Sequence, residues 1–202
     1  RAVRMVFEHQ GTSLSLLMPA LPGAHQIVNA GHAAAIARTL DVAQVRDEHI
    51  AEGVRSVDWP ARLQKLKSGP VVDALPGDWE VWLDGGHNPD AGATIARFAL
   101  ENWKDRPLYL ISGMINSKQP AGFFKPLAEV AEGVHCVTIP GEQAAIPADE
   151  LAGIASEAGL PAVTAETALA AAQAIASRAA TPGRVLICGS LYFAGSILAE
   201  HV

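Results

Sequence analysis

Short apolar runs alternate with longer amphipathic segments along most of this chain, and the alternation is clearest after residue 80. The runs Val-Trp-Leu, Leu-Tyr-Leu-Ile-Ser and Val-Leu-Ile-Cys contain no charged residue, which is typical of strands covered on both faces. Strands that alternate with helices of about 10–15 residues indicate βαβ units. We therefore predict an α/β fold, with a Rossmann-like, mostly parallel sheet and helices on both faces.

The predicted strands of this region cover residues 81–83, 108–112, 134–139, 162–165 and 185–188. The predicted helices cover residues 90–103, 120–132, 147–158, 166–179 and 191–200. Just before them, residues 62–67 and 71–74 are expected to pair as a hairpin, because Ser-Gly-Pro between them is a turn signal.

The first part of the chain follows a different pattern. Its predicted strands cover residues 4–8 and 13–18, and its predicted helices cover residues 29–40 and 47–54, with Asn29 at or near a helix start. Two strands and two helices leave an apolar face uncovered, so they do not close a domain by themselves. We expect residues 1–53 to be the truncated end of one domain and residues 54–202 to form a second, complete domain.

Composition excludes several classes of protein. The 202 residues are 50% hydrophobic and 18% charged, with a net charge of −6, which argues against disorder and against a nucleic-acid surface. No uncharged apolar run is long enough to span a membrane, and the charged first ten residues do not resemble a signal peptide. Cys136 and Cys188 lie in apolar contexts and are expected to be buried thiols. We expect a cytoplasmic protein.

The richest candidate site is the segment Leu-Asp-Gly-Gly-His-Asn-Pro-Asp at residues 83–90, where the two glycines are expected to let another backbone or a ligand approach closely. In open parallel sheets, ligands bind beyond the carboxyl ends of the strands, where Asp84 and His87 are expected. A carboxylate beside a histidine suits a ribose, a metal or an amine, and the spacing does not choose among them. An ordinary loop with Asn88 or Asp90 as helix cap is the structural alternative.

Three further segments carry possible ligand contacts. Arg62 follows a Trp-Pro corner, which suits anion recognition by a fixed guanidinium, although a surface arginine is the alternative. Lys118 follows the strand that ends at Ser112, but its loop is not a P-loop. Ser190 follows the last strand and is expected to cap the final helix, a role that is compatible with ligand binding.

The order of these motifs resembles the folylpolyglutamate synthase and dihydrofolate synthase family of the Mur ligase superfamily. The segments that carry the resemblance are LPGAHQIVNA at 21–30, WPARLQ at 59–64, LDGGHNPDA at 83–91, GM at 113–114 and CGSLY at 188–192. The resemblance runs through the whole chain in order. It implies a complete C-terminal glutamate-ligase domain preceded by the end of the central ATPase domain, as in a fragment of a longer protein.

The resemblance implies an ATP-dependent amide ligase that joins L-glutamate to folate or dihydropteroate through an acyl phosphate. The implied partners are ATP, these substrates and an N-terminal P-loop domain of the same protein. Magnesium ligands are expected in that domain, and no metal ligand is assigned within this chain. The chain alone is expected to be inactive.

Residue by residue, the family pattern implies ATP contacts for Asn29, Arg62 and Asp84, and glutamate contacts for His87 and Ser190. Arg62 and His87 are the implied catalytic residues. The chain departs from the family pattern at two of these motifs. Position 61 is alanine where the family has glycine, and position 86 is glycine where the family has alanine. The family's acidic loop has also become Asn-Ser-Lys-Gln at 116–119, which leaves its role open.

Two other functions are considered. A cell-wall Mur ligase is disfavoured, because such enzymes generally have His-Arg-x-Glu-x-Val where this chain has WPARLQ. A non-catalytic α/β ligand-binding module shares the fold pattern but does not account for Arg62, Asp84 and His87 at one sheet edge. The choice between first and later glutamate addition, the product length and the oligomeric state are not encoded in these motifs.

Overall fold

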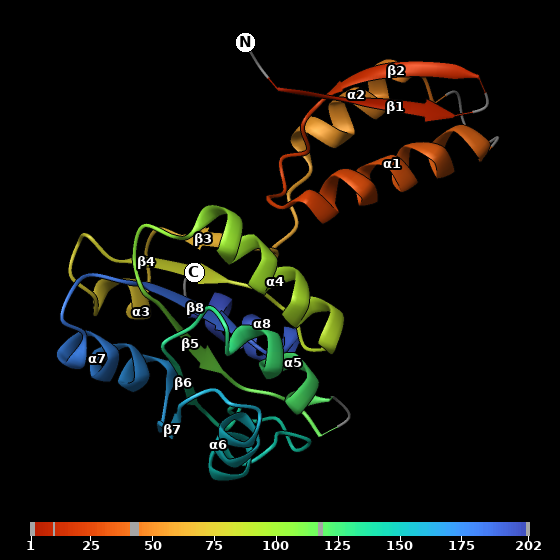
Figure 1. The fold of residues 1–202 in the computed structure, drawn as a ribbon. Helices are drawn as coiled ribbons and strands as arrows, with labels where there is room; N and C mark the ends of the chain where they lie inside the picture. The colour runs from red at the N-terminus through yellow and green to blue at the C-terminus, as the bar shows by residue number, and fades with distance from the viewer. Residues whose placement is uncertain (1–2, 10, 41–44, 117–118, 201–202) are drawn as a thin grey trace. The chain divides into compact units, whose positions relative to one another are not determined.

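The computed structural model describes residues 3–9, 11–40, 45–116 and 119–200 (Figure 1). The chain divides into two compact units, Arg1–Pro60 and Ala61–Val202. The predicted boundary after residue 53 falls inside helix α2 (Asp47–Ser56). The two units instead divide after Pro60, seven residues later and beyond the end of this helix.

The first unit combines a hairpin with two helices. Strands β1 (Arg4–His9) and β2 (Thr12–Leu17) pair antiparallel, and helices α1 (Ala24–Thr39) and α2 follow them. Both strands and the second helix were predicted within two residues. The unit has a small core of its own, made of Met5, Phe7, Leu16, Ala34, Ile50 and Val54.

Helix α1 begins five residues earlier than the sequence predicted. Gly23 precedes it with φ of 105°, a conformation that favours glycine, and Gln26 donates its amide to the Gly23 carbonyl in the first turn. Asn29 therefore lies inside the helix, and the prediction that it starts or caps the helix is wrong.

The second unit is built on a six-stranded sheet with the order β3-β4-β8-β5-β6-β7. Its strands are β3 (Gln64–Leu66), β4 (Glu80–Leu83), β5 (Leu108–Ser112), β6 (Gly133–Cys136), β7 (Ala162–Thr164) and β8 (Arg184–Cys188). All neighbours pair parallel except β3 with β4. The predicted mostly parallel α/β sheet is confirmed.

Helices cover both faces of this sheet. They are α3 (Pro70–Asp73), α4 (Pro89–Asn102), α5 (Pro120–Leu127), α6 (Ala148–Glu157), α7 (Ala168–Arg178) and α8 (Leu191–Ala199). In β8, Leu186 packs into the core with α4, α5 and α6, whereas Val185 and Ile187 pack into the core with α3, α7 and α8. Burial on both faces accounts for the apolar run at residues 185–188. The first residue of β8, Arg184, is also buried, and it forms ion pairs with Glu80 and Asp105.

Several predicted elements differ in the structure, including the strand predicted over residues 134–139, which ends at Cys136. Residues 62–67 and 71–74 do not form a hairpin, because β3 pairs with β4 and residues 70–73 form α3. Pro70 suits the first turn of a helix, where a backbone N–H is not needed. Helix α5 also ends at Leu127, five residues before the predicted end at 132, since the chain then turns into β6. Among the described residues, no helix is long and apolar enough to cross a membrane.

Candidate functional site

The parallel strands β4, β5 and β8 end at one edge of the sheet. Asp84 follows β4, Ser112 ends β5, and Ser190 follows β8 by two residues. Their carboxyl ends lie together because the strands are in register, with Leu83 opposite Ile187 and Ser112 opposite Cys188. In sheets of this kind, ligands bind at this edge.

Arg62 lies in a tight loop at the same edge, just before β3. Its neighbours Ala61 and Leu63 adopt left-handed conformations, with φ of 56° and 45°, which non-glycine residues rarely do. Both neighbours are buried, whereas Arg62 is partly exposed and its Nη1 donates to the Ala61 carbonyl at 3.0 Å. Burial of the two neighbours thus holds the arginine at the surface. The alanine at 61 occupies a conformation that explains why the resembling family uses glycine there.

Two side chains fasten this loop. Asp84 is buried, and its Oδ2 accepts the Leu63 amide at 2.8 Å while its Oδ1 accepts the Gly86 amide at 2.7 Å. Gln64 Oε1 accepts the Ala61 amide at 2.9 Å. Asp84 therefore joins the arginine loop to the loop after β4. Gln64 stands in the WPARLQ motif, but its residue type and position there gave no local signal for this role.

Backbone hydrogen bonds join three loops at this edge. The Gly85 amide donates to the Ala61 carbonyl, and the Gly189 amide donates to the Gly86 carbonyl, both at 2.9 Å. A Cβ at Gly85 would collide with the Leu191 side chain and lie 3.2 Å from Arg62 Nη1. The close approach that the paired glycines predicted is therefore made at Gly85 by side chains of the same protein.

His87 projects from the loop after β4 with one nitrogen engaged. Its Nδ1 lies 2.9 Å from the Gly85 carbonyl oxygen. A carbonyl oxygen only accepts, so Nδ1 carries the proton in this contact, and Nε2 of the neutral ring is then an acceptor. Asn88 caps α4, because its Oδ1 accepts the Ala91 amide at 2.9 Å. A fixed ring orientation suits a residue that receives a hydrogen bond from an incoming amine.

Ser190 is buried and caps helix α8. Its Oγ accepts the Tyr192 amide at 3.1 Å, which confirms the predicted capping role. The hydroxyl proton is not used by this contact, so Ser190 keeps a donor.

Asn29 belongs to the first unit, where it is exposed and its Nδ2 donates to Gln26 Oε1 at 3.1 Å. The structure thus brings Arg62, Asp84, His87 and Ser190 to one edge of the second unit. The predicted Lys118 lies outside the described residues, as does Ser117.

Both cysteines are free and buried, as predicted. Burial raises the pKa of the Cys136 thiol to about 12, and burial likewise raises the pKa of Cys188 well above its ordinary value. Neither thiol is available as a thiolate nucleophile. Within the described ranges, no three His, Cys, Asp or Glu side chains are grouped in a way that fits a metal ion such as magnesium.

Comparison with known proteins agrees with this geometry. Residues 62–191 match the family model described as Mur ligase, glutamate ligase domain. The chain is 35% identical, over 85% of its length, to a protein of Halobacterium salinarum named as a probable bifunctional folylpolyglutamate synthase/dihydropteroate synthase. It is 30% identical, over half of its length, to the folylpolyglutamate synthase of Lacticaseibacillus casei. The chain spans only 20% and 21% of the lengths of these two relatives.

Solved structures share the fold. Escherichia coli FolC in complex with DHPP and ADP matches with a TM-score of 0.77 and 22% identity, over 96% of this chain and 42% of that chain. Mycobacterium tuberculosis folylpolyglutamate synthase complexed with ADP matches with a TM-score of 0.77 and 24% identity, over 96% of this chain and 46% of that chain.

Proposed function

The chain belongs to the Mur ligase family through its glutamate ligase domain, and from this premise we propose that it is part of an ATP-dependent ligase that adds L-glutamate to folate or dihydropteroate. The observation that carries the proposal is the Arg62 loop, which Asp84 fastens to the carboxyl edge of the sheet beside His87. The folylpolyglutamate synthases among the relatives support the same substrate class.

We assign the second unit to the glutamate-ligase domain and the first unit to the end of an ATP-binding domain. In this proposal, a P-loop and the magnesium ligands are supplied by another part of the full protein. The assignment fits a chain that spans only about a fifth of the length of its Halobacterium and Haloferax relatives.

The proposed reaction has two steps. A substrate carboxylate oxygen attacks the γ-phosphorus of ATP and releases ADP, and the amine of glutamate then attacks the resulting acyl carbon and releases phosphate. Arg62 stabilises the charge on the transferring phosphoryl group, as a fixed guanidinium does. His87 orients the amine through Nε2, because its Nδ1 is held by Gly85.

The proposed roles of the remaining residues follow from their contacts. Both carboxylate oxygens of Asp84 accept hydrogen bonds from backbone amides, so Asp84 acts by positioning Arg62. Each oxygen can accept a further hydrogen bond, and Asp84 contacts the nucleotide through these remaining acceptor positions. Ser190 offers its hydroxyl proton to the glutamate carboxylate. For Asn29, the proposed ATP contact rests on the family pattern and not on a contact in the structure.

The test uses the full-length protein that contains this chain. ATP consumption is measured with glutamate and, in separate reactions, dihydropteroate, a reduced folate or a nucleotide-linked cell-wall precursor. We expect ADP release with one or both pteridine substrates. Release with the cell-wall precursor alone would identify the other branch of the superfamily. The 202-residue chain is expected to show no turnover, and turnover by that chain would contradict the proposed division of the ATP site.

A further inference from the structure

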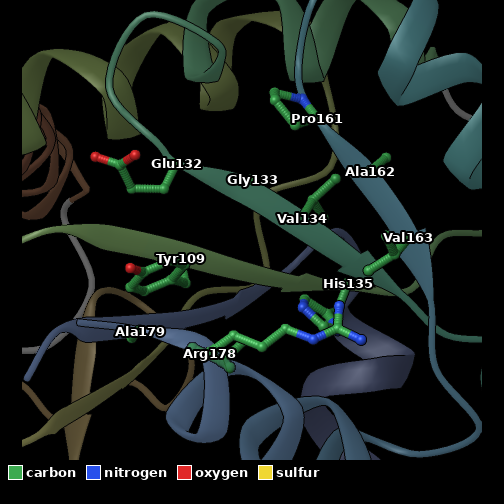
Figure 2. A pocket seen from close by; sticks show the side chains of 11 residues that line it. Tyr109, Glu132, Gly133, Val134, His135, Pro161, Ala162, Val163, Arg178 and Ala179 are labelled. Carbon is green, nitrogen blue, oxygen red and sulfur yellow. The ribbon is translucent and has the colours of Figure 1, made fainter. Parts of the chain in front are cut away.

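A pocket lies at the amino-terminal ends of the parallel strands, opposite to the ends that carry Asp84 and Ser190 (Figure 2). It has a volume of about 270 Å³ and lies between the first residues of β5, β6 and β7 and the last turn of α7. This volume is just below the ~300 Å³ at which drug-sized ligand sites begin, so the pocket suits a small molecule rather than a nucleotide.

Four polar side chains face this pocket, namely Tyr109, Glu132, His135 and Arg178. Among the described residues, none of the four side chains has a hydrogen-bond or ion-pair partner. The Nδ1 atom of His135 is also shielded from solvent, and a buried polar atom without a partner is costly. Glu132 and Arg178 are exposed, so water can reach their charges, whereas the buried Nδ1 of His135 would gain a partner only from a group that enters the pocket.

The charges in the pocket are separated by sign. Glu132 and Tyr109 lie together at one end, and Arg178 extends to His135 at the other end (Figure 2). The positive charge of Arg178 acts on His135, and the negative charge of Glu132 acts on Tyr109. The walls between them are apolar, with Pro161, Ala162 and Ile175 among the lining residues.

We propose that this pocket binds a small zwitterion, whose carboxylate contacts Arg178 and His135 and whose ammonium group contacts Glu132. Arginine matches a carboxylate through paired N–H donors, and the opposite charges of the ligand and pocket are then each neutralised. The Tyr109 hydroxyl oxygen adds a further acceptor for the ammonium group. The site does not depend on the ligase activity proposed above, since none of its residues belongs to the other edge.

The protonation of His135 provides an independent readout. Burial lowers the pKa of His135, and the charge of Arg178 lowers it further, so the ring is neutral at pH 7. The other titratable groups lining the pocket are Tyr109 from β5, Glu132 before β6 and Arg178 from α7, and the β7 segment contributes none. A carboxylate bound beside the ring favours the imidazolium, so binding should raise the pKa of His135.

The experiment is an NMR titration of the 202-residue chain with glycine, β-alanine, 4-aminobutyrate and 6-aminohexanoate. We expect at least one of them to shift the amides of residues 132–135 and the His135 ring protons saturably. Butyrate and butylamine, each with one of the two charges, should bind about tenfold or more weakly than the best zwitterion, because each leaves one pole unpaired.

Variants locate the site. Arg178→Gln and Glu132→Gln should each weaken binding about tenfold or more. The control Arg97→Gln, which removes an exposed arginine on α4, should leave binding unchanged. The proposal is overturned if no zwitterion shifts these signals up to about 10 mM, a concentration well above ordinary affinities. It is equally overturned if butyrate binds as tightly as the best zwitterion or if Arg178→Gln binds normally.

Discussion

At the scale of the residue, Arg62 is held at the sheet edge by buried neighbours on both sides. If it stabilises the transferring phosphoryl group, Arg62→Ala in the full-length enzyme should lower kcat by about 10²-fold or more, the scale of losing one transition-state contact. Steady-state kinetics with Arg97→Ala as control would measure this, since Arg97 is also an exposed arginine but lies on α4. A normal kcat for Arg62→Ala would mean that the arginine is only a surface residue.

The contribution of Asp84 to stability can be measured without substrate. Asparagine at this position keeps one oxygen but replaces the other with an amide nitrogen, which cannot accept the N–H of Leu63 or Gly86. Asp84→Asn should therefore lower the free energy of unfolding of the chain by about 1–3 kcal/mol. Urea denaturation tests this against the exposed Asp73→Asn. Equal stability of the two variants would argue that Asp84 serves only the nucleotide.

At the scale of the element, helices α4 and α5 approach closely at Gly92. A Cβ there would collide with the Phe123 carbonyl oxygen, and this backbone atom has little room to move. Gly92→Ala should destabilise the second unit by about 1–3 kcal/mol through overpacking. Gly153→Ala on the exposed face of α6 meets nothing within 4 Å and should stabilise by about 0.5–1 kcal/mol. Denaturation curves with the same sign for both variants would contradict this packing argument.

Strands β4 and β8 are joined by a charge network at their first residues. Burial opposes ionisation of Glu80, but hydrogen bonds from Lys65, Arg184 and Trp82 outweigh it and lower the pKa of Glu80 from 4.5 to about 2. Because the pKa is lower in the folded state, this contribution to stability is complete above about pH 4.5 and is lost as the pH falls towards 2.

The free energy of unfolding should therefore decrease across that acidic interval, and Glu80→Gln should flatten the decrease. Urea titrations at a series of pH values measure both. An unchanged pH dependence in Glu80→Gln would show that other carboxylates carry it.

At the scale of the whole molecule, the two units differ in the size of their cores. Among its described residues, the first unit has six buried core residues, whereas the second unit has an apolar core on each face of a six-stranded sheet. A unit of about 60 residues buries a smaller fraction of its surface and is marginally stable. Amides of β1 and α1 should consequently exchange with solvent faster than those of β8. Hydrogen exchange read by mass spectrometry would measure this, and equal protection would contradict it.

The sequence by itself determined the α/β class, most strand and helix positions, and the residues of the candidate site in the second unit. Unbroken apolar runs such as residues 185–188 are local signals, because burial on both faces requires them whatever the neighbouring strands are. The paired glycines after Asp84 likewise predicted a close approach to the backbone, and the Leu191 side chain makes this approach at Gly85. The capping role of Ser190 was also readable from its place before an apolar helix.

The tertiary structure alone decided the partners of these elements. Strand β3 pairs with β4 rather than with its sequence neighbour, which the local turn signal could not reveal. The carboxylate of Asp84 bonds to an amide 21 residues away, so its use in holding the Arg62 loop depends on the folded register of β3 and β4. The pocket at Arg178 could not be predicted from the sequence either, because its residues come from three strands and a helix that are distant along the chain. Periodicity and turn chemistry report on neighbours along the chain, whereas contacts between distant segments exist only once the sheet has formed.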